Sequence, residues 1–199
     1  MYNSLSQILL KIAAPGIPDF YQGTELLDFS LVDPDNRRPV DYKHRQELFE
    51  SICDLGNDPA KTLLETPEDG RIKLYLIWKT LGLRRQHPDL FQQGEYLPLA
   101  VEGAQADHVV AFARKTPTSS MLVIVPRLVV GLLDDFDVPP IGARIWEDTH
   151  IVIPFCSCSG KYRNVFTGVD VDSQRSDGFE KIGVAKILAE FPVALCVLG

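Results

Sequence analysis

The stretch that decides the fold runs from Pro15 to Glu25 with the sequence PGIPDFYQGTE, and a second part runs from Asp33 to Tyr42 as DPDNRRPVDY. Its prolines and glycine end the helix that precedes it. A short apolar and aromatic run follows from Ile17 to Tyr21, and then a loop rich in carboxylates, amides and arginines. This order predicts a buried parallel strand whose carboxyl end opens into a polar loop, which is how the active-site face of a (β/α)8 barrel is built.

The sequence around this stretch predicts helices up to about residue 94. Leu5, Ile8, Leu9 and Ile12 have helical spacing and stop before the first proline. A second helix is expected over residues 44–55, and a third from Thr66, with proline in its first turn, to about residue 87. Trp78 lies in the apolar pattern of this third helix and is therefore expected in the core.

From about residue 95 the pattern changes to short β-rich runs separated by turn residues. Such runs at this spacing predict an antiparallel sandwich. Exposed loops are expected at residues 131–140 and 170–178. The expected strands cover residues 95–99, 108–114, 121–126, 143–147, 150–155, 163–167 and 191–198.

The composition is that of an ordinary cytoplasmic globular protein, with 45% apolar residues and a formal net charge of −7. An acidic chain is a poor partner for nucleic acid or for an anionic membrane, and it suits a neutral substrate such as a glucan. The start of the chain lacks the pattern of a signal peptide. The most apolar stretch, residues 121–133, is interrupted by Pro126 and Arg127, so no membrane-spanning helix is expected.

The cysteines and histidines predict no metal site. Of the four cysteines only Cys156 and Cys158 are close together, as C-x-C, and there is no C-x-x-C pair. The four histidines are scattered along the sequence. Reduced and mostly buried thiols are the expected state.

The first block, PGIPDFYQGTEL, resembles the segment after the last barrel strand in the alpha-amylase superfamily. Its extension, SLVDPDNRRPVDY, is similar to one family within it, the maltooligosyl trehalose synthases. The resemblance continues through LRRQHP at residues 83–88, PLAVEG at residues 98–103 and FPVAL at residues 191–195. One departure is Leu27, which stands where members often carry a tryptophan.

The chain has 199 residues, whereas a (β/α)8 barrel alone takes about 250. The resemblance therefore implies an α+β fragment: a helical remnant of the end of a (β/α)8 barrel, followed by an antiparallel β-sandwich C-terminal domain. Residues 1–94 would hold the last barrel strand and its flanking helices, and residues 95–199 the sandwich. The family's catalytic carboxylates come from motifs that this sequence lacks. We thus expect no catalytic residue and no activity in this chain alone.

The resemblance implies that the intact enzyme converts the reducing-end α-1,4 bond of maltooligosaccharides into an α,α-1,1 trehalose bond. This intramolecular transglycosylation passes through a covalent glucosyl-enzyme and requires no metal or organic cofactor. Two other interpretations stay open: a non-catalytic carbohydrate-binding or interaction module, and another glycosidase of the alpha-amylase superfamily. An incomplete barrel also exposes strand edges and apolar faces, so we expect self-association.

The candidate substrate-binding residues share one region, the end of the expected strand and the loop after it. Amides, carboxylates and aromatic rings are the groups that hold neutral sugars, which favours a site role for Gln22 and Glu25. The alternative is that the loop's arginines pair with its aspartates and hold its shape, which we favour slightly for Arg37 and Arg38. The full set is Tyr21, Gln22, Glu25, Asp33, Asp35, Asn36, Arg37 and Arg38.

Overall fold

The longer helices of the chain precede its strands, as the sequence pattern predicts. The computed structural model describes residues 1–30, 37–56, 58–133, 135, 138–155 and 160–198. None of the described helices is long and apolar enough to cross a membrane. The helices up to residue 92 are α1 (Tyr2–Ala13), α3 (Tyr42–Cys53), α4 (Pro59–Glu65), the 3-10 turn η1 (Pro67–Asp69), α5 (Arg71–Gln86) and α6 (Pro88–Gln92).

The helix boundaries follow from local chemistry. Helix α1 ends at Ala13, before Pro15 and Gly16. Helix α4, which the sequence did not predict, begins where the Asp58 side chain accepts a hydrogen bond from the Lys61 amide, with Pro59 in the first turn. The predicted long helix begins at Arg71 rather than near residue 66, because left-handed Gly70 (φ 80°) separates it from η1.

Two antiparallel sheets form the second half of the chain. The order of the first sheet is β1-β3-β4-β10-β6-β7, and that of the second is β2-β5-β9-β8. Every pairing in both sheets is antiparallel. This confirms the expected β-sandwich. The strands are β1 (Glu95–Pro98), β2 (Ala100–Glu102), β3 (Val109–Lys115), β4 (Ser120–Pro126), β5 (His150–Ile153), β6 (Lys161–Asn164), β7 (Asp170–Asp172), β8 (Gln174–Ser176), β9 (Phe179–Gly183) and β10 (Ala194–Leu198).

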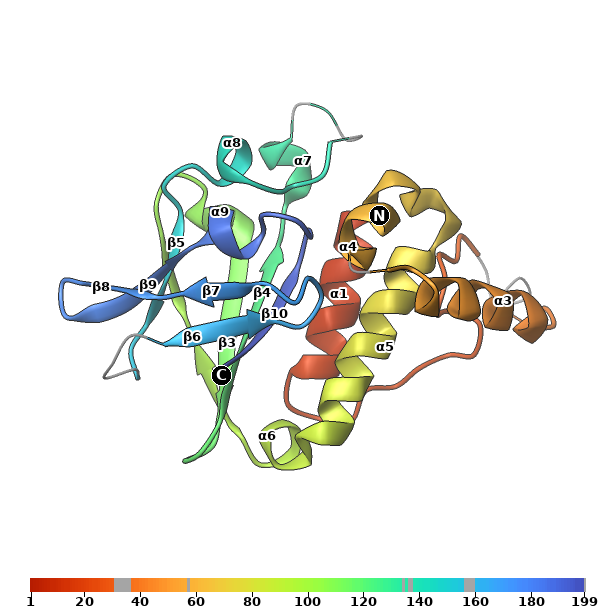
Figure 1. Ribbon diagram of the computed structural model, residues 1–199, viewed down its shortest axis with the longest axis horizontal. Helices are drawn as coiled ribbons and strands as arrows, with labels where there is room; N and C mark the ends of the chain where they lie inside the picture. Colours follow the sequence, from red (N-terminus) through yellow and green to blue (C-terminus); the bar gives the residue numbers. More distant parts are fainter. Residues whose placement is uncertain (31–36, 57, 134, 136–137, 156–159, 199) are drawn as a thin grey trace.

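The six-stranded sheet is covered on both faces. Along β4, Leu122 and Ile124 belong to the core shared with the second sheet, whereas Val123 and Val125 belong to the core shared with α1 and α5. This alternation explains why all seven residues of β4 are buried. The result is three layers, with the helices on one side of the large sheet and the small sheet on the other (Figure 1).

The predicted strand over residues 17–21 is wrong. These residues form no regular structure, and the side chains of Ile17 and Tyr21 are 96% and 70% exposed. A barrel strand is stable only between parallel neighbours. In the described part of the chain every paired strand is antiparallel and lies after residue 94, so these residues have no strand to pair with.

Two further predictions in the β region are corrected. Residues 143–147 are not a strand, because Ala143–Trp146 forms the short helix α8, whose Trp146 is fully buried and donates its Nε1 hydrogen to the Pro140 carbonyl at 2.8 Å. Residues 170–178 are not a loop, because they contain β7 and β8. Other short helices are α7 (Val129–Leu132), η2 (Ala106–His108) and α9 (Val184–Ile187).

Candidate functional site

The loop that follows α1 carries the candidate residues, and basic side chains on the helices hold its first part. The Arg84 guanidinium on α5 donates to the carbonyl of Ile12 at 2.8 Å and to that of Gly16 at 3.3 Å. The ammonium of Lys11 lies 4.5 Å from the centroid of the Phe20 ring. The path of the loop is therefore fixed before it reaches Tyr21, although its backbone forms no strand or helix.

A tight turn then brings Tyr21, Gln22 and Glu25 together. The Tyr21 carbonyl accepts hydrogen bonds from the amide of Thr24 at 3.2 Å and from its hydroxyl at 2.7 Å. Gly23 adopts a left-handed conformation (φ 93°), which a side chain would strain. The turn thus gives the three candidate side chains one fixed starting geometry.

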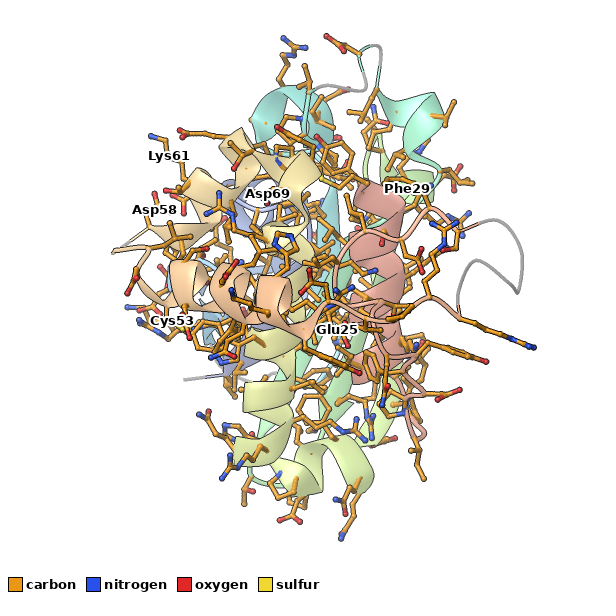
Figure 2. The ribbon with its side chains drawn as sticks, turned by 90° about the vertical axis from the view of Figure 1, so that its right-hand side faces the viewer. Glu25, Phe29, Cys53, Asp58, Lys61 and Asp69 are labelled. Atoms are coloured by element: carbon orange, nitrogen blue, oxygen red, sulfur yellow. The ribbon has the colours of Figure 1, made fainter. Side chains whose placement is uncertain are left out.

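Helix α3 holds this turn from the other side. Arg45 donates from Nε to Oε2 of Glu25 at 3.1 Å, and its guanidinium also donates to the carbonyls of Gly23 and Asp41. Tyr42 donates its hydroxyl hydrogen to Oε1 of Gln22 at 2.9 Å. Gln22 and Glu25 are therefore oriented by α3. In Figure 2 Glu25 lies near the centre of this face, close to α3.

A buried lysine supports the end of the turn. Lys73 on α5 is only 8% exposed, and its Nζ donates to the Leu26 carbonyl at 2.9 Å. Burial lowers the pKa of Lys73, an effect that the charges of Asp28 and Glu25 oppose. The pKa of Asp28 is lowered by hydrogen bonds from the side chain and the backbone of Ser30.

The remaining candidate residues lie in the second part of the loop. Arg37 and Arg38 are exposed and precede the Asp41 side chain that caps α3. Asp33, Asp35 and Asn36 lie outside the described residues, as do Cys156 and Cys158. The structure thus brings Tyr21, Gln22 and Glu25 together, and the substrate-binding role of the whole set stays a prediction.

Sequence reasoning missed three residues that position the turn: Tyr42, Arg45 and Lys73. The sequence does indicate a special role for Lys73, because this charged residue lies within the apolar run from Ile72 to Ile77 and therefore needs a buried hydrogen-bond acceptor. It gives no such indication for Tyr42 and Arg45, since a polar side chain on an exposed helix face gives no hint of a partner twenty residues earlier.

Several apolar and aromatic side chains of the loop after α1, and one at the start of α3, are exposed. Ile17, Tyr21 and Phe29 are 96%, 70% and 85% exposed, and Tyr42 is 57% exposed. Figure 2 looks onto this side of the molecule and shows Phe29 on the loop, apart from Glu25. Exposed apolar side chains that gather on one side are typical of an interaction surface. Within the described ranges, no three His, Cys, Asp or Glu side chains are grouped as metal ligands.

The chain is similar to maltooligosyl trehalose synthases in both sequence and structure. It is 40% identical over 149 residues to a Mycobacterium tuberculosis (strain CDC 1551 / Oshkosh) protein named "Putative maltooligosyl trehalose synthase", which covers 73% of the chain and 17% of that protein. The same figures hold for the protein of strain ATCC 25618 / H37Rv. The chain therefore spans less than a fifth of the length of these curated relatives. No protein-family model matches it.

Solved structures extend the similarity to the whole chain. The maltooligosyltrehalose synthase from Arthrobacter ramosus matches all of this chain and 22% of its own, with a TM-score of 0.75 and 35% identity. An alpha-amylase from Anoxybacillus also covers all of it, with a TM-score of 0.59 and 18% identity, which shows a common fold alone. The part of the Arthrobacter ramosus structure that matches therefore corresponds to the whole arrangement described above, a helical part followed by antiparallel sheets.

Proposed function

Because this chain corresponds to the C-terminal part of a maltooligosyl trehalose synthase, in the alpha-amylase superfamily, we propose that it supplies one wall of the sugar site in such an enzyme. The observation that carries the proposal is the turn at residues 21–25, which α3 holds so that a 70% exposed tyrosine ring stands beside an oriented amide and a carboxylate. These are the groups that bind a neutral sugar.

The polar groups of the turn are arranged to donate as well as to accept. Gln22 uses Oε1 to accept from Tyr42, so its Nε2 hydrogens, with no partner among the described residues, can donate to a sugar hydroxyl. Glu25 is ion-paired with Arg45, and its carboxylate oxygens can accept hydrogen bonds from sugar hydroxyls. Asp33, Asp35, Asn36, Arg37 and Arg38 would extend the same wall around the reducing-end glucose.

The reaction of the whole enzyme then defines the role of this wall. The reducing-end α-1,4 bond of a maltooligosaccharide breaks, the remaining maltooligosyl group forms a covalent glycosyl-enzyme, and the released glucose attacks it through its own anomeric hydroxyl to give the α,α-1,1 bond. A wall that keeps the released glucose in place favours this internal transfer over attack by water. The nucleophile and the acid/base lie on earlier barrel motifs, so this chain alone binds sugar without turning it over.

The test is an amide chemical-shift titration of the isotope-labelled chain with maltohexaose. We expect shifts centred on residues 21–30 and 37–38, and their loss in Tyr21→Ala. The matched control is Phe179→Ala, since Phe179 is a 48% exposed aromatic residue on β9, far from the turn in the sequence. Shifts confined to residues after 95 would instead support a carbohydrate-binding module, and equal loss in both variants would contradict the role of Tyr21.

The exposed apolar side chains near the turn are the proposed contact to the rest of the barrel. Ile17 and Phe29, both on the loop after α1, are 96% and 85% exposed. In the chain by itself, we propose that a second copy covers them and that it self-associates. Sedimentation velocity should show a concentration-dependent dimer that Ile17→Glu weakens. A monomer at all concentrations would refute the self-association.

A further inference from the structure

A groove runs along α5 at the junction between the helices and the large sheet. It consists of two hollows of about 400 and 180 Å³ that share Lys79, Leu83, Gln86 and Val165. The helix forms one bank, and the segment from Arg163 to Gly168, at and after β6, forms the other. Its larger hollow is within the size range of small-molecule sites, which occur preferentially at junctions of this kind.

The floor of the groove is open because of one glycine. Gly82 lies inside α5, four residues before its last residue, and a Cβ added there would meet nothing within 4 Å. A glycine inside a helix lowers helix stability relative to alanine, and no close packing contact requires this one. Its effect is to let a flat molecule approach the helix backbone between Trp78 and Gln86, positions that lie four residues to either side.

Trp78 lies in the groove wall and not in the core, contrary to the expectation from the apolar pattern. It is 39% exposed and lines the smaller hollow. The Phe49 ring supports it edge-on, with the centroids 5.2 Å apart, and the Lys79 ammonium lies 5.6 Å from its centroid. An aromatic ring held in this way presents an apolar surface, with the Lys79 ammonium over the ring and Gln86 in the same hollow.

The residues that line the groove favour a neutral polyhydroxylated ligand. No carboxylate is among the described residues that line either hollow. The Arg163 guanidinium is already 3.4 Å from a carboxylate oxygen of Asp170. The Gln86 amide and the Lys79 ammonium are left as donors to hydroxyl groups. An aromatic platform with a few polar groups around it binds a sugar ring by stacking and hydrogen bonds.

We propose that this groove binds a segment of linear α-glucan, with one sugar ring on Trp78 and the next over Gly82. The proposal rests on the proposed function for the identity of the sugar, but it concerns a different site. Asp58 immediately precedes Pro59, which lines the larger hollow, and Figure 2 shows Asp58 on the opposite side of the view from Phe29. A glucan held here would keep the substrate close to the protein without occupying the loop wall.

The two tryptophans of the chain provide the test. Trp146 is fully buried, so acrylamide quenching of the folded protein reports on Trp78. Maltohexaose should protect Trp78 from acrylamide in a saturable manner. The matched pair is Gly82→Ala, whose single methyl group fills little of the groove and should raise Kd only slightly, and Gly82→Leu, which fills the groove and should raise Kd at least about tenfold. Circular dichroism confirms that both variants fold.

The outcomes separate this proposal from the proposed function. Protection that survives Gly82→Leu, or none at millimolar sugar, would overturn the groove proposal. Protection by inorganic phosphate but not by maltohexaose would also overturn it, in favour of an anion site. Loss of the loop's amide shifts in Tyr21→Ala, with Trp78 still protected, would show two independent sites. Amide shifts in the loop without any protection of Trp78 would support the loop wall and overturn the groove proposal.

Discussion

Replacing Arg114 with methionine should destabilise the chain more than any change at its surface. Arg114 on β3 is 1% exposed and donates three hydrogen bonds to backbone carbonyls: from Nε to Gly94 at 3.0 Å, from Nη1 to Ala13 at 3.1 Å and from Nη2 to Phe91 at 2.8 Å. It therefore joins the end of α1, the end of α6 and the large sheet through one side chain.

The magnitude follows from the groups that the substitution leaves behind. Burial lowers the pKa of Arg114, but a guanidinium stays protonated, so the native state holds a buried charge whose hydrogen bonds offset its desolvation. Methionine keeps the apolar stem and removes both the charge and three donors. Hydrogen bonds to charged groups contribute about 1.5–3 kcal/mol each, and part of their loss is regained because no charge is buried any longer. We expect a net loss of about 3–5 kcal/mol.

Urea unfolding, followed by circular dichroism, measures this loss. With a slope of about 2–3 kcal/mol/M, the midpoint should fall by about 1–2.5 M. The control is Arg144→Met, the same change at an exposed position of α8, which should alter stability by no more than about 0.5 kcal/mol. If the two variants unfold at the same urea concentration, the carbonyl contacts of Arg114 do not hold the layers together and the reasoning fails.

Three further predictions concern buried titratable groups. Burial raises the pKa of Tyr75 to about 12, so the unfolded chain loses the phenol proton at a lower pH than the folded chain. The free energy of unfolding should therefore fall by about 2–3 kcal/mol as pH rises from about 10 to 12. Urea titrations at each pH measure this decrease, and Tyr75→Phe should remove it. Burial also raises the pKa of Cys196 to about 12, whereas Cys53 is exposed. In a variant that lacks the other two cysteines, Ellman's reagent should label Cys53 at once and Cys196 only on unfolding. Two equally fast labelling phases would contradict this prediction. Glu180 is 1% exposed, and neither of its carboxylate oxygens has a hydrogen-bond partner among the described residues. Glu180→Met should therefore raise the free energy of unfolding by about 1–3 kcal/mol. A lower melting temperature for this variant would show that the carboxylate has a stabilising role.

The sequence predicts those elements whose cause is local. The periodicity from Leu5 to Ile12 and the proline after it are sufficient to place α1, and the apolar run from Met121 to Pro126 is sufficient for β4. The run from Ile17 to Tyr21 has three apolar residues but also contains Pro18 and Asp19, and it is not a strand, because a strand also needs neighbours and the described chain provides none for it. The apolar residues of a short run do not by themselves show whether such neighbours exist.

The candidate site was predictable in part for the same reason. Tyr21, Gln22 and Glu25 lie within five residues, so a turn brings them together without help from distant parts of the chain. The contacts that orient Gln22 and Glu25 come from α3, about twenty residues later, and depend on how two helices pack. No pattern in one sequence encodes that packing, which is why the supporting residues were missed.

The double burial of β4 has a consequence for dividing this protein. The change from helices to strands near residue 95 suggests a place to cut, but Val123 and Val125 fill the same core as Leu9 and Leu76. A protease that cleaved the chain beside Gly94 would leave two pieces bound to each other as a non-covalent complex. Anyone who exchanges segments between relatives should therefore transfer α1, α5 and the large sheet together, as one inherited unit.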